Sequence, residues 1–110
     1  MSYGKMNTFI DIIESVTTKD SEGFRTEVDH IVASVRAYRE GRHGNEKWAN
    51  RAAFTEATDL FCFRRIPGLT ITTAMVVANG DSRFEITSVE DVKGRGMYLE
   101  VLAKEVKSSG

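Results

Sequence analysis

The strongest structural constraint in this sequence is a hairpin signal in its second half. The run Met75–Ala78 is followed by Asn79-Gly80 and then by a second run, Arg83–Val89. Asn-Gly supplies the positive φ that a tight two-residue turn requires, so the two runs predict paired antiparallel strands. After a glycine-bearing turn at 92–96, residues Met97–Val106 alternate apolar and polar side chains. This alternation predicts the third strand of a meander.

The first half of the chain carries the same period of two. Phe9–Val16 predicts a strand, 20–23 a turn, and Phe24–Val28 a second strand with one wet face, so the three segments predict a hairpin. His30–Arg39 predicts a further, separate strand. In the first strand, one face holds Ile10, Ile12 and Val16 and the other holds Phe9 and Ile13. The side chains expected to face inward in the strand over His30–Arg39 are Ile31, Ala33, Val35 and Ala37.

The middle of the chain predicts one helix and one more strand. Asn45 is well placed to cap a short helix that continues through an alanine-rich segment to Glu56. Strand character returns at Thr58–Arg65 and ends at Ile66-Pro67-Gly68, because proline cannot donate to a ladder. We therefore expect a mainly β fold: a small antiparallel β-barrel of about six strands, with one short helix in a central insertion loop, since closure removes sheet edges.

Length and composition favour a single soluble domain. The chain has 110 residues, of which 41% are hydrophobic and 28% charged, with a net charge of −1. We expect one domain over residues 8–106, with flexible termini at 1–7 and 107–110. The longest uninterrupted apolar run, Ala74–Ala78, is far shorter than the roughly 18 to 20 residues that cross a bilayer. Met1–Asn7 has no apolar signal-peptide centre, so neither export by such a signal nor membrane contact is expected.

The sequence contains few candidate residues for catalysis or metal binding. Its single cysteine, Cys62, stands among apolar residues and is interpreted as a core thiol in preference to a nucleophile. The two histidines, His30 and His43, are too scattered to form a metal site with it. Gly94-Arg95-Gly96 leads into a strand and lacks the features of a phosphate-binding loop. We therefore expect no catalytic, cofactor-binding or metal-binding residues, no cofactor and no enzymatic activity.

Charge is distributed unevenly along the chain. Residues 36–51 hold five basic and two acidic side chains, a balance of +3, whereas residues 85–105 hold three basic and five acidic ones, a balance of −2. Separated basic and acidic surfaces suit head-to-tail contact between identical copies, although ordinary solvated loops explain the pattern equally well. The candidate residues for a protein interface or a channel loop are Arg39, Arg42, His43, Lys47, Trp48 and Arg51.

Two alternatives stay open for these residues. Trp48 suits either a core anchor or an interface anchor. The second alternative is a nucleic-acid footprint formed by stacking and phosphate contacts, although the net charge of −1 argues against strong binding. The members of that footprint are Tyr38, Arg39, Arg42 and Lys47.

The order of the elements resembles the phage head-tail joining family, whose members are also called head-tail adaptors, stoppers or head-completion proteins. The likeness extends over Thr8–Val106, and its most specific part is the C-terminal series of an apolar strand, an Asn-Gly turn, Phe-Glu-Ile-Thr-Ser-Val and a final leucine-bearing strand. The segments that carry it are Thr17–Gly23 with Phe24–Glu27, Ile31–Ala37, Trp48–Ala57, Thr58–Arg65, Met75–Gly80, Arg83–Asp91 and Tyr98–Val101.

The resemblance implies a structural protein of a tailed phage or prophage virion. It implies a homo-oligomeric, dodecameric ring at the portal vertex that joins head to tail and helps retain packaged DNA, from a chain that is monomeric in isolation. The implied partners are the portal or adaptor ring, tail proteins and, non-specifically, DNA in the channel. The implied locations are the head–tail interface and, during assembly, the host bacterial cytoplasm. A tail-terminator or tail-completion ring and a small nucleic-acid-binding barrel remain as alternatives.

Overall fold

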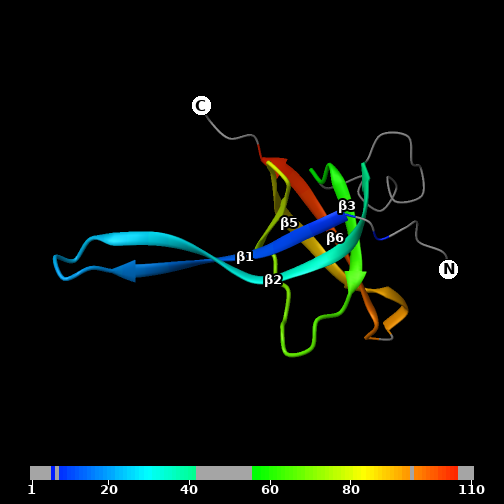
Figure 1. Cartoon of the computed structure of the whole chain (residues 1–110), viewed down its shortest axis with the longest axis horizontal. Coiled ribbons are helices and arrows are strands. Elements are labelled where there is room, and N and C mark those ends of the chain that lie inside the picture. The colour runs from blue at the N-terminus through cyan, green and yellow to red at the C-terminus, as the bar shows by residue number, and fades with distance from the viewer. Residues whose placement is uncertain (1–5, 7, 42–55, 95, 107–110) are drawn as a thin grey trace.

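Six antiparallel strands close into a barrel. The computed structural model describes residues 6, 8–41, 56–94 and 96–106. The strands follow one another around the barrel in the order β1-β2-β3-β6-β5-β4, with β4 returning to pair with β1 (Figure 1). Their bounds are β1 Thr8–Lys19, β2 Arg25–Gly41, β3 Asp59–Arg64, β4 Val76–Asn79, β5 Ser82–Asp91 and β6 Tyr98–Val106, with a 3₁₀ turn η1 at Val92–Gly94. The predicted mainly β, six-stranded antiparallel barrel is confirmed.

Some sequence predictions lie outside the described residues. The short helix expected from Asn45 to Glu56 falls almost entirely within 42–55, and the described part of the chain contains no α-helix. The termini expected to be flexible also lie outside it, apart from Met6, which is half-buried.

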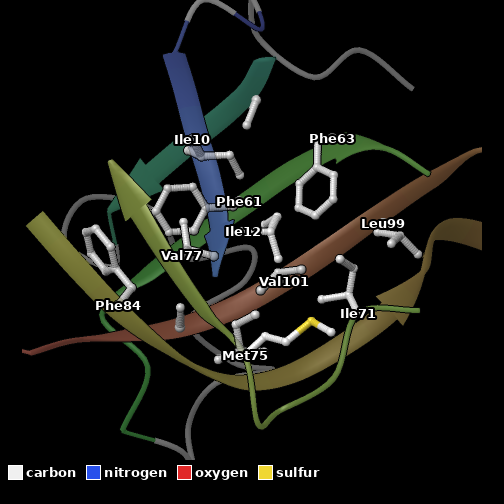
Figure 2. Close-up of a cluster of buried hydrophobic side chains, with 13 residues drawn as sticks. Ile10, Ile12, Phe61, Phe63, Ile71, Met75, Val77, Phe84, Leu99 and Val101 are labelled. Atoms are coloured by element: carbon white, nitrogen blue, oxygen red, sulfur yellow. The ribbon is translucent and has the colours of Figure 1, made fainter. Parts of the chain in front are cut away.

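The barrel is filled by side chains from alternate positions on all six strands (Figure 2). Phe61, Phe63 and Phe84 are completely buried, and the rings of Phe61 and Phe84 meet edge to face with their centroids 5.0 Å apart. Burying each such side chain stabilises the fold by roughly 1.5–3 kcal/mol. The cluster comprises Ile10, Ile12, Ala37, Phe61, Phe63, Ile71, Met75, Val77, Phe84, Ile86, Leu99, Val101 and Ala103.

Strand β3 is buried on both of its faces. A second, smaller cluster lies on the outer side of the barrel wall, where Leu60 and Cys62 from β3 pack with Leu102 from β6. Tyr38 and Tyr98 pack against it from the flanking strands. This second layer explains why five consecutive residues, 59–63, are all buried, whereas a strand with one wet face would alternate.

The two separate strands predicted over Phe24–Val28 and His30–Arg39 are one strand in the structure. Residues 25–39 belong to the continuous strand β2, which has 17 residues. No glycine or proline interrupts the chain at Asp29-His30, so the ladder to β1 runs on without a break. The β1–β2 ladder contains one β-bulge, further along β2 at Val32. Ile12 pairs with Ala33 and Ile13 with Ile31, so Val32 has no partner residue on β1.

The bulge changes which side chains are covered. Ile31 was expected to face inward, but it is 62% exposed, which corrects that prediction. Its partner Ile13 is buried at 8% exposure on the outer side of the wall. The alternation within a single strand cannot predict this change. The extra residue in β2 exchanges the inward and outward positions of β2 beyond the bulge, while those of β1 stay the same.

The β1–β2 hairpin extends beyond the barrel. Strand β4 pairs with β1 only at Asp11–Ile13, and β3 pairs with β2 only at Tyr38–Gly41. Residues 14–30, which we call the arm, therefore form a two-stranded ribbon with both outer edges free, and Figure 1 shows it projecting to one side. The molecule accordingly measures 53 × 33 × 25 Å.

The β4–β5 hairpin is confirmed with a shifted turn. Asn79 pairs with Ser82, so the two loop residues are Gly80 and Asp81, one position later than expected. Gly80 has φ +61°, a conformation that side-chain-bearing residues rarely adopt. The shift leaves the Asn79 side chain free to act elsewhere.

Candidate functional site

The predicted interface residues are described only at Arg39. The other five, Arg42, His43, Lys47, Trp48 and Arg51, fall within 42–55, outside the described residues. Their grouping as an interface or channel loop stays a prediction.

Arg39 lies across one end of the barrel core. Its Nε donates to Oδ2 of Asp59 at 2.9 Å, and its Nη1 donates to Oδ1 of Asn79 at 2.8 Å. The guanidinium carbon is 5.0 Å from the ring centroid of Phe84 and 6.0 Å from that of Phe61. The side chain of Asp59 is only 8% exposed and that of Arg39 35%, so the charged pair closes this end of the barrel above the aromatic rings.

Further hydrogen bonds extend this arrangement to other strands. Thr58 donates its hydroxyl to Oδ1 of Asp59 at 2.8 Å, and Asn79 donates its Nδ2 to the backbone carbonyl of Phe9 at 2.8 Å. Arg39, Thr58, Asp59 and Asn79, here called the rim network, therefore connect β2, β3, β4 and β1. The bond to Phe9 lengthens the short β1–β4 seam by one side-chain contact.

The arm has two chemically different faces. Directly opposite residues of an antiparallel ribbon share a face, and Val16 pairs with Val28 while Thr18 pairs with Thr26. The apolar arm face consists of Val16, Thr18, Phe24, Thr26 and Val28. The charged arm face consists of Ser15, Thr17, Lys19, Arg25, Glu27 and Asp29. The alternation in the sequence predicts a strand with one solvent-exposed face and its apolar face covered, whereas Phe24 on the apolar face is 66% exposed.

The base of the arm is tied to the barrel through its charged face. Asp29 accepts a hydrogen bond from the Ser15 hydroxyl at 2.8 Å and pairs with Nη1 of Arg83, on β5, at 3.0 Å. The hydrogen bond from Arg83 and, next, that from Ser15 lower the pKa of the Asp29 carboxyl below its ordinary value. These contacts orient the arm relative to the barrel wall.

A second exposed apolar patch lies on the outer wall of the barrel. Phe9 is 61% exposed, and the Arg36 guanidinium carbon is 5.0 Å from its ring centroid. Ile31 lies on the same outer face of the β1–β2 sheet, because Phe9 pairs with Arg36 and Ile13 with Ile31. We call Phe9, Ile31 and Arg36 the wall patch.

Cys62 is the one cysteine of the described residues, and it is buried. Burial, with a smaller contribution from Glu100, raises the pKa of the Cys62 thiol to about 12, so this sulfur is a poor nucleophile. Among the described residues, no three His, Cys, Asp or Glu side chains gather where they could hold a metal ion. The same residues include no helix long and apolar enough to span a bilayer.

Comparison with known families identifies the chain. The family model described as phage head completion protein matches residues 1–106. This chain belongs to the phage head completion protein family. The resemblance inferred from the sequence is confirmed, and the protein is a structural component of a virion.

Solved structures share the fold of this head completion protein. The solution structure of protein SF1141 from Shigella flexneri 2a matches with a TM-score of 0.74 at 18% sequence identity, covering 96% of each chain. A chain from the virion of a native gene transfer agent particle matches with a TM-score of 0.61 at 23% identity, covering 91% of this chain and 94% of that one. No curated protein is similar enough in sequence to match.

Proposed function

We propose that this head completion protein assembles as a homo-oligomeric, dodecameric ring at the portal vertex, where it joins head to tail and helps retain packaged DNA. The observation that carries the proposal is the family match over residues 1–106. The exposed arm and wall patch support it, because both are surfaces suited to contact with other proteins. Its partners are then the portal or adaptor ring on one side and tail proteins on the other, with assembly in the host bacterial cytoplasm.

In this proposal the basic residues of the central loop make a contact once the protein has bound the portal vertex. Arg42, Lys47 and Arg51, with Arg39 beside them in the sequence, give a positive stretch that suits either DNA in the channel or an acidic neighbouring ring. No catalytic step is part of this function, and none of these residues is assigned a chemical role.

The direct test is to incubate the purified protein with DNA-filled, tailless capsids of the same phage and to examine the portal vertex by electron microscopy. We expect ring-shaped density at the vertex and greater retention of DNA against nuclease. Absence from capsids together with binding to purified tails would instead assign a tail-terminator or tail-completion role.

The basic segment is tested in the same assay. The double variant Arg42→Glu/Lys47→Glu should lose capsid binding or DNA retention, while the charge-preserving control Arg42→Lys/Lys47→Arg should keep both. Circular dichroism should give the same melting curve for the two variants. Equal capsid binding and DNA retention by the two would remove this segment from the proposed interface.

A further inference from the structure

The described surface exposes its large apolar side chains mainly on one two-stranded sheet. Five of the seven exposed large hydrophobic residues belong to the β1–β2 hairpin, and the other two are Met97 and Val106. The five divide between the two patches defined above. Val16, Phe24 and Val28 lie on the apolar arm face, and Phe9 and Ile31 lie in the wall patch.

The two patches lie on opposite faces of that sheet. Phe9, Asp11 and Ile13 point outward along β1, and the charged arm face continues this outer side. Ile10 and Ile12 point into the barrel, and the apolar arm face continues that inner side beyond the bulge. The barrel covers the inner side only as far as the seam with β4, so beyond it the apolar arm face is left uncovered.

Two different apolar patches on opposite faces are what a head-to-tail contact between identical chains requires. An isologous contact would pair one patch with itself and leave the other exposed, whereas a heterologous contact covers both and can be repeated around a ring. One charge pairing is also available. The arm's inner side carries the carboxylates of Glu14 and Asp20, with His30 opposite Glu14 and neither Lys nor Arg. The wall patch carries Arg36, while the nearby outer-face carboxylate, Asp11, accepts a hydrogen bond from Ser34.

The size of the arm fits this contact. Six residue pairs, from Glu14↔His30 to Lys19↔Arg25, span about 20 Å, close to the 25 Å short dimension of the molecule. A ribbon of that length offers roughly 200 Å² on one face, far below the ~800 Å² per partner of a stable binary complex. One such contact cannot hold a dimer, but contacts closed around a ring reinforce one another.

We infer that the apolar arm face of each copy packs across the wall patch of the next copy. Phe24, Val28 and Val16 then lie over Phe9 and Ile31, and Glu14 lies within reach of Arg36. This inference rests on the proposed ring. It also predicts that free chains stay monomeric, since a single arm contact is too small to persist before a template brings the copies together.

Cysteine cross-linking on assembled particles tests the inference. The double variant Thr26→Cys/Ser34→Cys places one thiol on the apolar arm face and one beside the wall patch, while buried Cys62 stays unreactive. Particles from infected cells are purified, treated with a short bis-maleimide and analysed on a denaturing gel. We expect a ladder extending beyond dimers from the double variant and monomers from either single variant. The matched control Thr17→Cys/Ser34→Cys, with its arm thiol on the charged face, should give no ladder.

The outcomes separate this inference from the proposed function. Particle-bound protein that forms no ladder, or an equal ladder in the Thr17 control, would overturn the arm contact and leave the head-completion role intact. Dimers from Thr26→Cys alone would overturn it in favour of an isologous pair. Absence of the wild-type protein from the particles would overturn both.

A loss-of-contact variant gives a second readout. Phe24→Ser should lower the particle-bound fraction about tenfold, because a large aromatic side chain buried in an interface contributes much of its affinity. The control Met97→Ser changes a residue of similar exposure, 51%, outside both patches and should leave that fraction unchanged. Both variants should keep the wild-type melting temperature. Equal particle-bound fractions for the two variants would contradict the assignment of Phe24 to the contact.

Discussion

Replacing the guanidinium of Arg39 by an uncharged group should destabilise the isolated chain, whatever else this residue contacts after assembly. In Arg39→Met the aliphatic stem over Phe84 is kept, but the Asp59 carboxylate loses its counter-charge and Asn79 loses its donor. Hydrogen bonds to charged groups contribute about 1.5–3 kcal/mol, and breaking a fully buried ion pair costs about 3–5 kcal/mol. Since Arg39 is 35% exposed, we take the lower part of this range, about 2–3 kcal/mol. That free energy corresponds to a fall in Tm of roughly 10–15 °C for a domain of this size.

The assay is a double-mutant cycle in urea, with Arg39→Met, Asp59→Asn and the combined variant, followed by circular dichroism. The combined variant should be less destabilised than the sum of the single ones by about 1.5 kcal/mol or more, because each single variant leaves its partner without the opposite charge. A single-variant cost below about 0.5 kcal/mol, or a coupling close to zero, would refute the stabilising role of the rim network.

The remaining predictions concern the turn, the buried thiol and the base of the arm. Gly80→Val should lower the free energy of unfolding by at least about 1–2 kcal/mol, because φ is +61° at Gly80. The control is Gly41→Val, because a Cβ added at Gly41 meets no atom within 4 Å and this residue has no positive φ. Equal unfolding free energies for the two variants would show that the turn is misassigned. At pH 8 iodoacetamide should alkylate Cys62 about a thousandfold more slowly in the folded than in the unfolded chain, since its pKa is about 12 instead of 9.0; similar rates would mean that the thiol is accessible. Arg83→Gln should raise the pKa of Asp29 toward its ordinary value in an NMR titration of the side-chain carboxyl. Because the folded-state pKa of Asp29 is lowered, its contribution to stability is present at neutral pH and is lost as the pH falls through that folded-state pKa. Arg83→Gln should therefore lose less stability on acidification than the wild type. An unchanged titration curve of Asp29 in this variant would contradict the Arg83–Asp29 contact.

Local patterns were sufficient to predict most of the strands. The alternation around Arg83–Val89 and Met97–Val106, and the glycine-dependent turn at Gly80, are short-range features that act wherever the chain is placed. The bulge at Val32 and the outward turn of Ile31 depend on how β2 aligns with β1, which no single-strand pattern contains. The two strands predicted over Phe24–Val28 and His30–Arg39 are one strand for a different reason, because no glycine or proline at Asp29-His30 interrupts the ladder to β1.

The roles of particular side chains were harder to predict. Arg39 could be recognised as a basic residue beside a basic loop, but its partners Asp59 and Asn79 lie 20 and 40 residues further along the chain and are brought to it only by barrel closure. The pattern Phe24, Thr26, Val28 correctly indicated an apolar face. Alternation shows that a face is apolar, but whether the same chain covers it depends on how far the neighbouring strands extend, and β4 stops pairing at Ile13.

The sharing of β1 and β2 between the barrel and the arm has a mechanical consequence. A force applied at the arm tip travels along these two strands directly into the barrel wall, with no flexible linker to absorb it. It reaches the β1–β4 seam, which consists of three residue pairs supported by the side chain of Asn79. The β1–β2 ladder is far longer, so under tension the barrel should open at this seam while the arm remains intact.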